Sequence, residues 1–202
     1  MADSRPRHES VASFAGAAAS CILAALSARD YLSDHDVLPV VYVGVHAVTA
    51  VLFVARRHQA LRPTSQLPDA IAMLSLLSPY VYDASALDRA GPVIGGLLIA
   101  AAVFLLVSTL SLGRSFGILP AVRDIRTTGA YRVVRHPIYT SYLLMDAAIL
   151  AADPSRRNVA VFGVATALLL ARIQFEEELL STIEEYRQYT QRIRYRLIPF
   201  VF

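Results

Sequence analysis

The chain has 202 residues, 55% of them hydrophobic, and its mean hydropathy is +0.48. An ordinary soluble domain is less apolar than this, so the composition favours a membrane-embedded protein. All 19 basic residues are arginines and the formal net charge is +3, which favours phosphate, carboxylate or lipid headgroups as partners. Because the arginines lie between apolar runs and form no single basic face, the pattern argues against nucleic acid as a partner.

Apolar segments follow one another along the chain. They cover about residues 11–28, 37–55, 67–82, 90–112, 137–152 and 158–173. A bilayer crossing takes roughly 20 residues. We therefore predict an all-α polytopic membrane protein with about five to six membrane helices. A cleaved signal peptide is the alternative for the first segment. We divide the chain into a polar tail over 1–10, membrane helices of a substrate-side bundle over 11–112, and a motif-bearing core over 113–202.

The last two apolar segments are short, which predicts a hairpin that enters the membrane and returns. Asp153 followed by Pro154 is typical of a helix start, with the aspartate as N-cap and the proline in the first helical position. From there the apolar pattern continues into "RIQFEEELLSTIEEYRQYTQRI". We expect one long helix that leaves the membrane and forms a C-terminal helix on the cytoplasmic side.

The arginines also predict an orientation. If the N-terminus is cytoplasmic, 15 of the 19 arginines fall in connections on the cytoplasmic side. Connections on that side of a membrane are enriched in basic residues. We therefore expect residues 129–135 and the C-terminal tail to share the cytoplasmic face of an integral membrane protein, which in a bacterium would be the inner membrane.

The stretch "GAYRVVRHPIYTSY", residues 129–142, joins basic side chains directly to an apolar run. Pro137 suits the first position of a helix, because its missing N–H is not needed there. Arg135 and His136 would then lie at the helix start, where free N–H groups and a guanidinium together make an anion site. The alternative is an arginine that only extends to lipid headgroups.

Three glutamates, Glu176 to Glu178, follow Arg172 at the end of the last apolar segment. The helical repeat of 3.6 residues puts Arg172 and Glu176 on one stripe, with Glu177 beside it. Such a pair can present a cation and a carboxylate to the same ligand. The alternative is a solvated helix end.

Two polar residues within apolar segments need a separate explanation. Asp146 shares a helix face with Tyr142, and a carboxylate in a membrane segment faces a cavity or a neighbouring helix. For His46 we expect a polar contact between helices. The five histidines are scattered and Cys21 is the single cysteine, so we expect no metal and no disulfide.

The sequences "GAYRVVRHPIYTSYLL", "RIQFEEELL" and "YRQYTQRIRYRLIPF" resemble the isoprenylcysteine carboxyl methyltransferase family, which is related to the phospholipid methyltransferases. The resemblance covers about residues 110–202. It departs at Ala130, where family members often have proline, and at Ser141, where they often have glycine. It implies a membrane methyltransferase that uses S-adenosylmethionine, with residues 113–202 as its methyltransferase core.

The resemblance also implies roles for individual residues. The residues implied to bind the cofactor are Arg135, His136, Pro137, Tyr139, Glu176 and Glu177. Arg172 and Glu177 would act as the catalytic pair where methyl donor and acceptor meet. The family motif does not explain Asp146, and its shared helix face with Tyr142 makes these two residues candidate substrate contacts. We expect a lipophilic acceptor, with an isoprenylcysteine-like carboxylate first and a phospholipid, amine or thiol as alternatives. A noncatalytic membrane scaffold of the same architecture is the rival interpretation.

Overall fold

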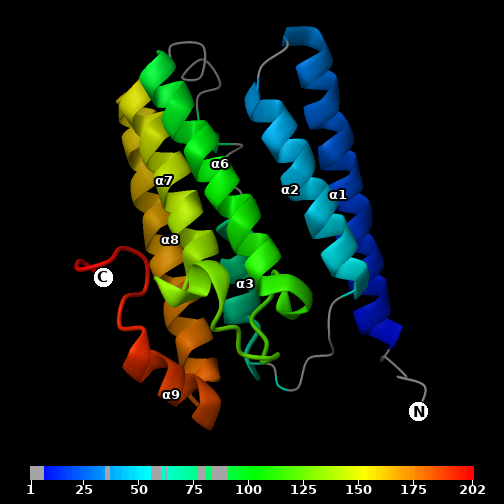
Figure 1. The fold of residues 1–202 in the computed structure, drawn as a ribbon, viewed down its shortest axis with the longest axis vertical. Helices are drawn as coiled ribbons and strands as arrows, with labels where there is room; N and C mark the ends of the chain where they lie inside the picture. The colour runs from blue at the N-terminus through cyan, green and yellow to red at the C-terminus, as the bar shows by residue number, and fades with distance from the viewer. Residues whose placement is uncertain (1–6, 35–36, 56–60, 62, 77–80, 83–90) are drawn as a thin grey trace.

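The computed structural model describes residues 7–34, 37–55, 61, 63–76, 81–82 and 91–202. Within these residues the fold is built of helices that run side by side, and loops gather at their ends (Figure 1). The described part contains no named strand and one isolated antiparallel bridge, between Leu61 and Val122. The predicted all-α class is confirmed.

Seven α-helices lie in the described residues. They are α1 (Arg7–Asp34), α2 (Val37–Ala55), α3 (Leu67–Leu74), α6 (Pro92–Leu112), α7 (Pro137–Ala152), α8 (Arg156–Leu180) and α9 (Glu184–Arg192). Two 3-10 turns, η1 (Gly113–Ser115) and η2 (Gly129–Arg132), lie between α6 and α7. The apolar segments predicted over 37–55 and 137–152 coincide with α2 and α7, and α3 covers the first half of the segment predicted over 67–82.

Two of the helices in the described residues are long and apolar enough to cross a membrane. These spans are Pro92–Ser115 and Arg156–Leu180, and shorter apolar helices cover Ser13–Arg29, Val40–Ala55 and Pro137–Ala152. Large apolar side chains point outward from the long helices, as Val93 of α6 and Val164 of α8 do with 76% and 61% of their surface exposed. Such surfaces suit contact with lipid. The figure of five to six crossings stays a prediction.

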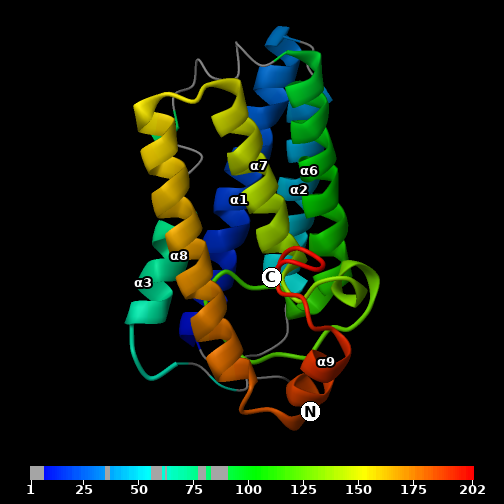
Figure 2. The ribbon, with the colours of Figure 1, turned by 90° about the vertical axis from the view of Figure 1, so that its left-hand side faces the viewer.

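The helices α2, α6 and α7 share one apolar core. Ala101 and Ala102 of α6 are buried there with Val45 of α2 and Met145 of α7. Small side chains let membrane helices approach closely. This packing fixes α7 against α6, and Figure 2 shows that α6 ends and α7 begins near the end of the molecule that carries α9.

The predicted helix start at Asp153 and Pro154 is wrong. Helix α8 begins at Arg156, and Ser155 is its N-cap, with a hydroxyl that accepts a hydrogen bond from the Asn158 backbone N–H at 3.3 Å. Asp153 instead ends α7, and its backbone carbonyl accepts a bond from the Asn158 side chain at 2.9 Å. The buried Asn158 amide thus selects the later cap. Helices α7 and α8 form the expected hairpin, and its entry into a membrane stays a prediction.

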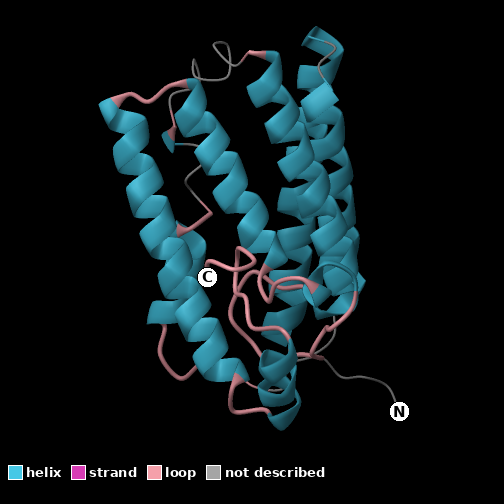
Figure 3. Ribbon diagram, turned by 60° about the vertical axis from the view of Figure 1, so that its left-hand side comes forward, coloured by secondary structure: helices cyan, strands magenta, loops and turns pink. Residues whose placement is uncertain are grey.

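The expected long helix through to the C-terminal region is also wrong. Helix α8 ends at Leu180, and α9 begins at Glu184. Between them the hydroxyls of Ser181 and Thr182 turn back to carbonyls of the last helical turn, at 2.8 and 2.7 Å. Side chains of this kind compete with helical hydrogen bonding. The break redirects α9 across the loop-rich end of the molecule (Figure 3).

Some predictions fall on residues outside the described ones. Most of the N-terminal tail over 1–10 is among them, as are Arg56, Arg57 and Arg62, which entered the count of cytoplasmic arginines. The structure likewise gives no account of residues 77–80 in the third apolar segment.

Gly129 provides a test of the loop-rich end. Its φ is +61°, and a Cβ there would lie 2.3 Å from the Ser111 hydroxyl oxygen. We expect Gly129→Ala to lower the stability by about 1 to 2 kcal/mol, because alanine is strained in the left-handed region. Thermal unfolding in detergent measures this. Gly163→Ala is the control, because a Cβ added at Gly163, within α8, would have nothing within 4 Å. Equal unfolding midpoints for the two variants would contradict the argument.

Candidate active site

The start of α7 is covered by the C-terminal segment. Pro137 occupies the first turn of α7 and His136 is the N-cap, as predicted. The backbone N–H groups of Arg135 and His136 donate to the carbonyls of Tyr195 and Arg196, both at 2.9 Å. These two N–H groups, just before the helix, are therefore bound within the protein.

The carboxylate of Glu177 joins this segment to α8 and α9. The Arg135 guanidinium donates to it through Nε at 2.7 Å and Nη2 at 3.2 Å, and Arg196 donates through Nε at 2.8 Å. His136 Nε2 lies 3.1 Å from the same carboxylate, and the Tyr186 hydroxyl donates to it at 3.3 Å. We call these residues, Arg135, His136, Glu177, Tyr186 and Arg196, the Glu177 cluster.

Arg135 has further bonds that hold the tail. Its Nη1 donates to the carbonyls of Ile193 and Arg194 at 3.0 and 2.8 Å. With the two bonds to Glu177, most of its five N–H donors are taken by the protein. The guanidinium predicted to bind a ligand anion is thus mainly engaged in holding the C-terminal segment against α7 and α8.

Glu176, the neighbour of Glu177, faces the other way. Its carboxylate accepts a short hydrogen bond from the Tyr139 hydroxyl and another from Arg172 Nε at 3.3 Å. The Arg172 guanidinium lies 4.8 Å from the centre of the Tyr139 ring. The His136 ring also stacks with the Tyr139 ring, at 5.5 Å between centroids. The predicted stripe of Arg172 and Glu176 is formed.

A pocket opens beside this group at the loop-rich end. It contains about 1020 Å³ of empty space, part of it open to solvent. The predicted residues that line it are Arg135, His136, Tyr139, Tyr142, Arg172 and Glu176. Pro137, Asp146 and Glu177 are not part of the lining. The structure therefore brings both motifs to one pocket, and it leaves Glu177 in the cluster behind the wall.

Aromatic rings form much of the pocket wall. Tyr131, Tyr186 and Tyr189 line it together with Phe116. Burial raises the pKa of the Tyr131 phenol, and the Glu176 carboxylate raises it further. Burial also raises the pKa of Tyr186, with Glu177 adding to the effect. These phenols are neutral at physiological pH and can donate hydrogen bonds, as Tyr189 does to the Tyr131 carbonyl at 2.7 Å.

The pocket roof is a segment that the sequence analysis did not assign to the site. Residues 115–121 and 123–126 of the loop between η1 and η2 line the pocket, including Arg123, Asp124 and Arg126. The Arg123 guanidinium lies against Gly117, where a Cβ would come within 2.4 Å of Nη1. No short motif marks this loop. The loop falls within the family resemblance over about residues 110–202, including "LGRSFGILPA", but the resemblance gave its residues no role.

The sequence model of the isoprenylcysteine carboxyl methyltransferase family matches residues 94–182. We call residues 94–182, which match this model, the family domain. The match confirms the resemblance and indicates a membrane methyltransferase in general terms. No curated protein matches the chain significantly. The family domain contains every predicted site residue, whereas Tyr186 and Tyr189, which complete the pocket, lie beyond its end.

Two polar residues that the sequence analysis singled out, Asp146 of α7 and His46 of α2, are not part of the pocket lining. Asp146 is 8% exposed, one helical turn from Tyr142 on α7. His46 of α2 stacks with Tyr42 at 6.1 Å between ring centroids. Among the described residues, no group of histidine, cysteine, aspartate and glutamate side chains could hold a metal ion. The substrate role of Tyr142 and Asp146 stays a prediction.

The Glu177 cluster predicts what happens when its carboxylate is neutralised. We expect Glu177→Gln to speed amide hydrogen exchange over residues 184–202 by at least about 10-fold, because hydrogen bonds to charged groups contribute about 1.5 to 3 kcal/mol each. Hydrogen exchange with mass spectrometry measures this.

Glu178→Gln is the matched control, because Glu178 is exposed and its side chain makes no hydrogen bond or ion pair within the described chain. If the two glutamine variants exchange at the same rate in the tail, the cluster does not hold the C-terminal segment.

Proposed function

We propose that the protein is an S-adenosylmethionine-dependent membrane methyltransferase that acts on a lipophilic acceptor. The observation that carries the proposal is that two sequence motifs meet at a single pocket, although their arginines, Arg135 and Arg172, are 37 positions apart. The family domain supports methyl transfer as the type of reaction.

The pocket chemistry fits this cofactor. A sulfonium cation is favoured by aromatic faces and by carboxylates, and the pocket offers Tyr139, Tyr131 and Glu176. Ribose hydroxyls can donate to a carboxylate such as Glu176. When bound, the cofactor supplies an activated methyl group. We assign His136, Tyr139 and Glu176 to direct contact with it, and Pro137 to starting the helix that carries Tyr139.

Arg135 and Glu177 take a supporting part in this proposal. Their paired charges hold α7, α8 and the tail together, which keeps the aromatic wall of the pocket in place. Alignment of donor and acceptor within about 1 Å is worth roughly 100-fold in rate. For an amine acceptor a proton must also leave, and a glutamate of the pair Glu176 and Glu177 would receive it. A carboxylate acceptor needs no such base.

Arg172 is the residue that we assign to the acceptor side. Its guanidinium joins α8 to Ser75, after α3, at 3.1 Å, and to the Ile118 carbonyl in the roof. It thus connects the family domain to the first hundred residues, which would shape the acceptor site. Isoprenylcysteine-like carboxylates are our first acceptor class, and phospholipids, amines and thiols are the alternatives. Tyr142 and Asp146 are proposed as deeper substrate contacts.

The arginine distribution supports a cytoplasmic pocket, because η2, α9 and the tail carry arginines on the face where the pocket opens. The acceptor would approach from the bilayer along apolar helices.

Cofactor binding is the direct test. We expect the purified protein in detergent to bind S-adenosylmethionine and its demethylated product, S-adenosylhomocysteine, in isothermal titration calorimetry. Tyr139→Phe should weaken both, because Glu176 then loses one hydrogen bond. Absence of binding at millimolar ligand would reject the methyltransferase and leave the noncatalytic scaffold.

Arg172→Lys tests the acceptor assignment. Lysine keeps the charge but loses the planar fork that reaches Glu176, Ser75 and Ile118 together. We expect turnover to fall roughly 100-fold, with cofactor affinity nearly unchanged, measured as labelled methyl transfer into lipid extracts. Arg187→Lys is the control, since that arginine is exposed and pairs with Glu184. Full activity of Arg172→Lys would show that only the charge matters.

A further inference from the structure

The pocket lining contains an arginine, Arg126, most of whose N–H donors have no partner among the described residues. Arg126 lines the roof in the loop between η1 and η2. Its Nε donates to the Ser115 hydroxyl at 3.3 Å, and among the described residues this is its single hydrogen-bond partner. A guanidinium has five N–H donors. Both terminal nitrogens of Arg126 therefore keep their full hydrogen-bonding capacity.

The motif arginines differ in this respect. Arg135 donates hydrogen bonds to Glu177 and to carbonyls of the tail. Arg172 donates three, to Glu176, Ser75 and Ile118. Both still line the pocket, but their charges are matched by protein groups. Of these three arginines, Arg126 is the one whose fork is open to a ligand.

The roof holds Arg126 in a fixed place. Val122, in the same loop, donates its backbone N–H to the Leu61 carbonyl at 2.9 Å and is buried. Ser115, which binds Arg126 Nε, is buried in η1, just after α6. One anchor thus holds the backbone four residues before Arg126 and the other holds its Nε, so the guanidinium is preorganised, which lowers the entropy lost on binding.

The surrounding charges favour an anion at this position. The acidic residues of the lining are Glu176, already bonded to Arg172 and Tyr139, and the exposed Asp124. The roof adds Arg123 to the positive side. A planar fork with two free NH₂ groups matches the two oxygens of a carboxylate or a phosphate.

We propose that Arg126 binds the carboxylate or phosphate group of a ligand in this pocket and so determines which ligands the pocket accepts. The proposal rests on the proposed function for the identity of the ligands. Two sources share this chemistry: the carboxylate of the cofactor's amino-acid part, and an anionic group on the acceptor. The conclusion about Arg126 concerns the anion and holds for either source.

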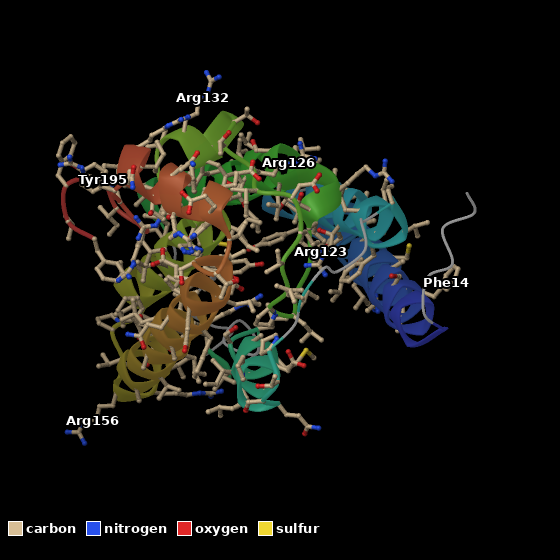
Figure 4. All side chains as sticks on the ribbon, turned by 90° about the horizontal axis from the view of Figure 1, so that it is seen from below. Phe14, Arg123, Arg126, Arg132, Arg156 and Tyr195 are labelled. Atoms are coloured by element: carbon tan, nitrogen blue, oxygen red, sulfur yellow. The ribbon has the colours of Figure 1, made fainter. Side chains whose placement is uncertain are left out.

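Arg132 is a matched control within the same segment. It has the same side chain six residues later, it is exposed, and it is not part of the pocket lining. Figure 4 shows its side chain extending away from the body of the protein, whereas Arg126 lies over the loops at the pocket end. Arg132→Gln therefore removes the same charge from the protein without touching the pocket.

The experiment compares the wild type with Arg126→Gln, Arg132→Gln and Ser115→Ala, each as the full chain. Calorimetry in detergent measures binding of S-adenosylmethionine and of its decarboxylated analogue. Binding of oleate and of oleyl alcohol, which differ in the carboxylate, is measured in nanodiscs. We expect Arg126→Gln to weaken one carboxylate ligand by about 10- to 100-fold, as for a lost charged hydrogen bond, and to leave the binding of the matching ligand without the carboxylate unchanged.

Loss confined to S-adenosylmethionine identifies the cofactor as the source of the anion, and loss confined to oleate identifies the acceptor. Equal affinities in Arg126→Gln and Arg132→Gln overturn the proposal. Ser115→Ala should weaken the same ligand less than Arg126→Gln does, because it removes the bond that positions Arg126 Nε and keeps the guanidinium. If the wild type binds neither form of the cofactor, the proposed function fails while the oleate comparison still decides the role of Arg126. Binding of none of the probes rejects both.

Discussion

The carboxylate of Glu177 is the contact on which the geometry of the pocket depends. It receives hydrogen bonds from Arg135 at the start of α7, Arg196 of the tail and Tyr186 of α9. Charges at the end of an apolar bundle are costly to bury unless they are paired and hydrogen-bonded. Here several segments far apart in sequence share one carboxylate, so the same contact that neutralises the charges also fixes the segments relative to one another.

Adjacent glutamates on one helix serve different sides because successive helical residues point about 100° apart. Glu177 points toward the tail, which leaves Glu176 to face Arg172 and the Tyr139 ring at the pocket. The position of one side chain thus determines the direction of the other. A proton acceptor or ribose contact would be expected of the glutamate that lines the pocket, and a supporting part of the one behind it.

The pocket is made from more of the chain than the family domain. Residues 94–182 supply its motif side chains, but α9 adds aromatic walls from beyond that range, and Leu76 adds an apolar surface from before it. The roof loop lies inside the domain and carries no motif. In the proposed function, contacts to the methyl acceptor come largely from these parts without motifs, so the family match indicates methyl transfer without naming an acceptor.

The sequence by itself determined the features that local physics controls. The helix at Pro137, the helical bounds of 37–55 and the stripe of Arg172 and Glu176 follow from proline geometry, hydrophobic content and the helical repeat. Only the tertiary structure decided which donors remain available. Arg135 and Arg126 look equally free in the sequence. In the structure, carbonyls of the tail almost sixty positions away accept hydrogen bonds from Arg135 and not from Arg126, so the fork of Arg126 stays open.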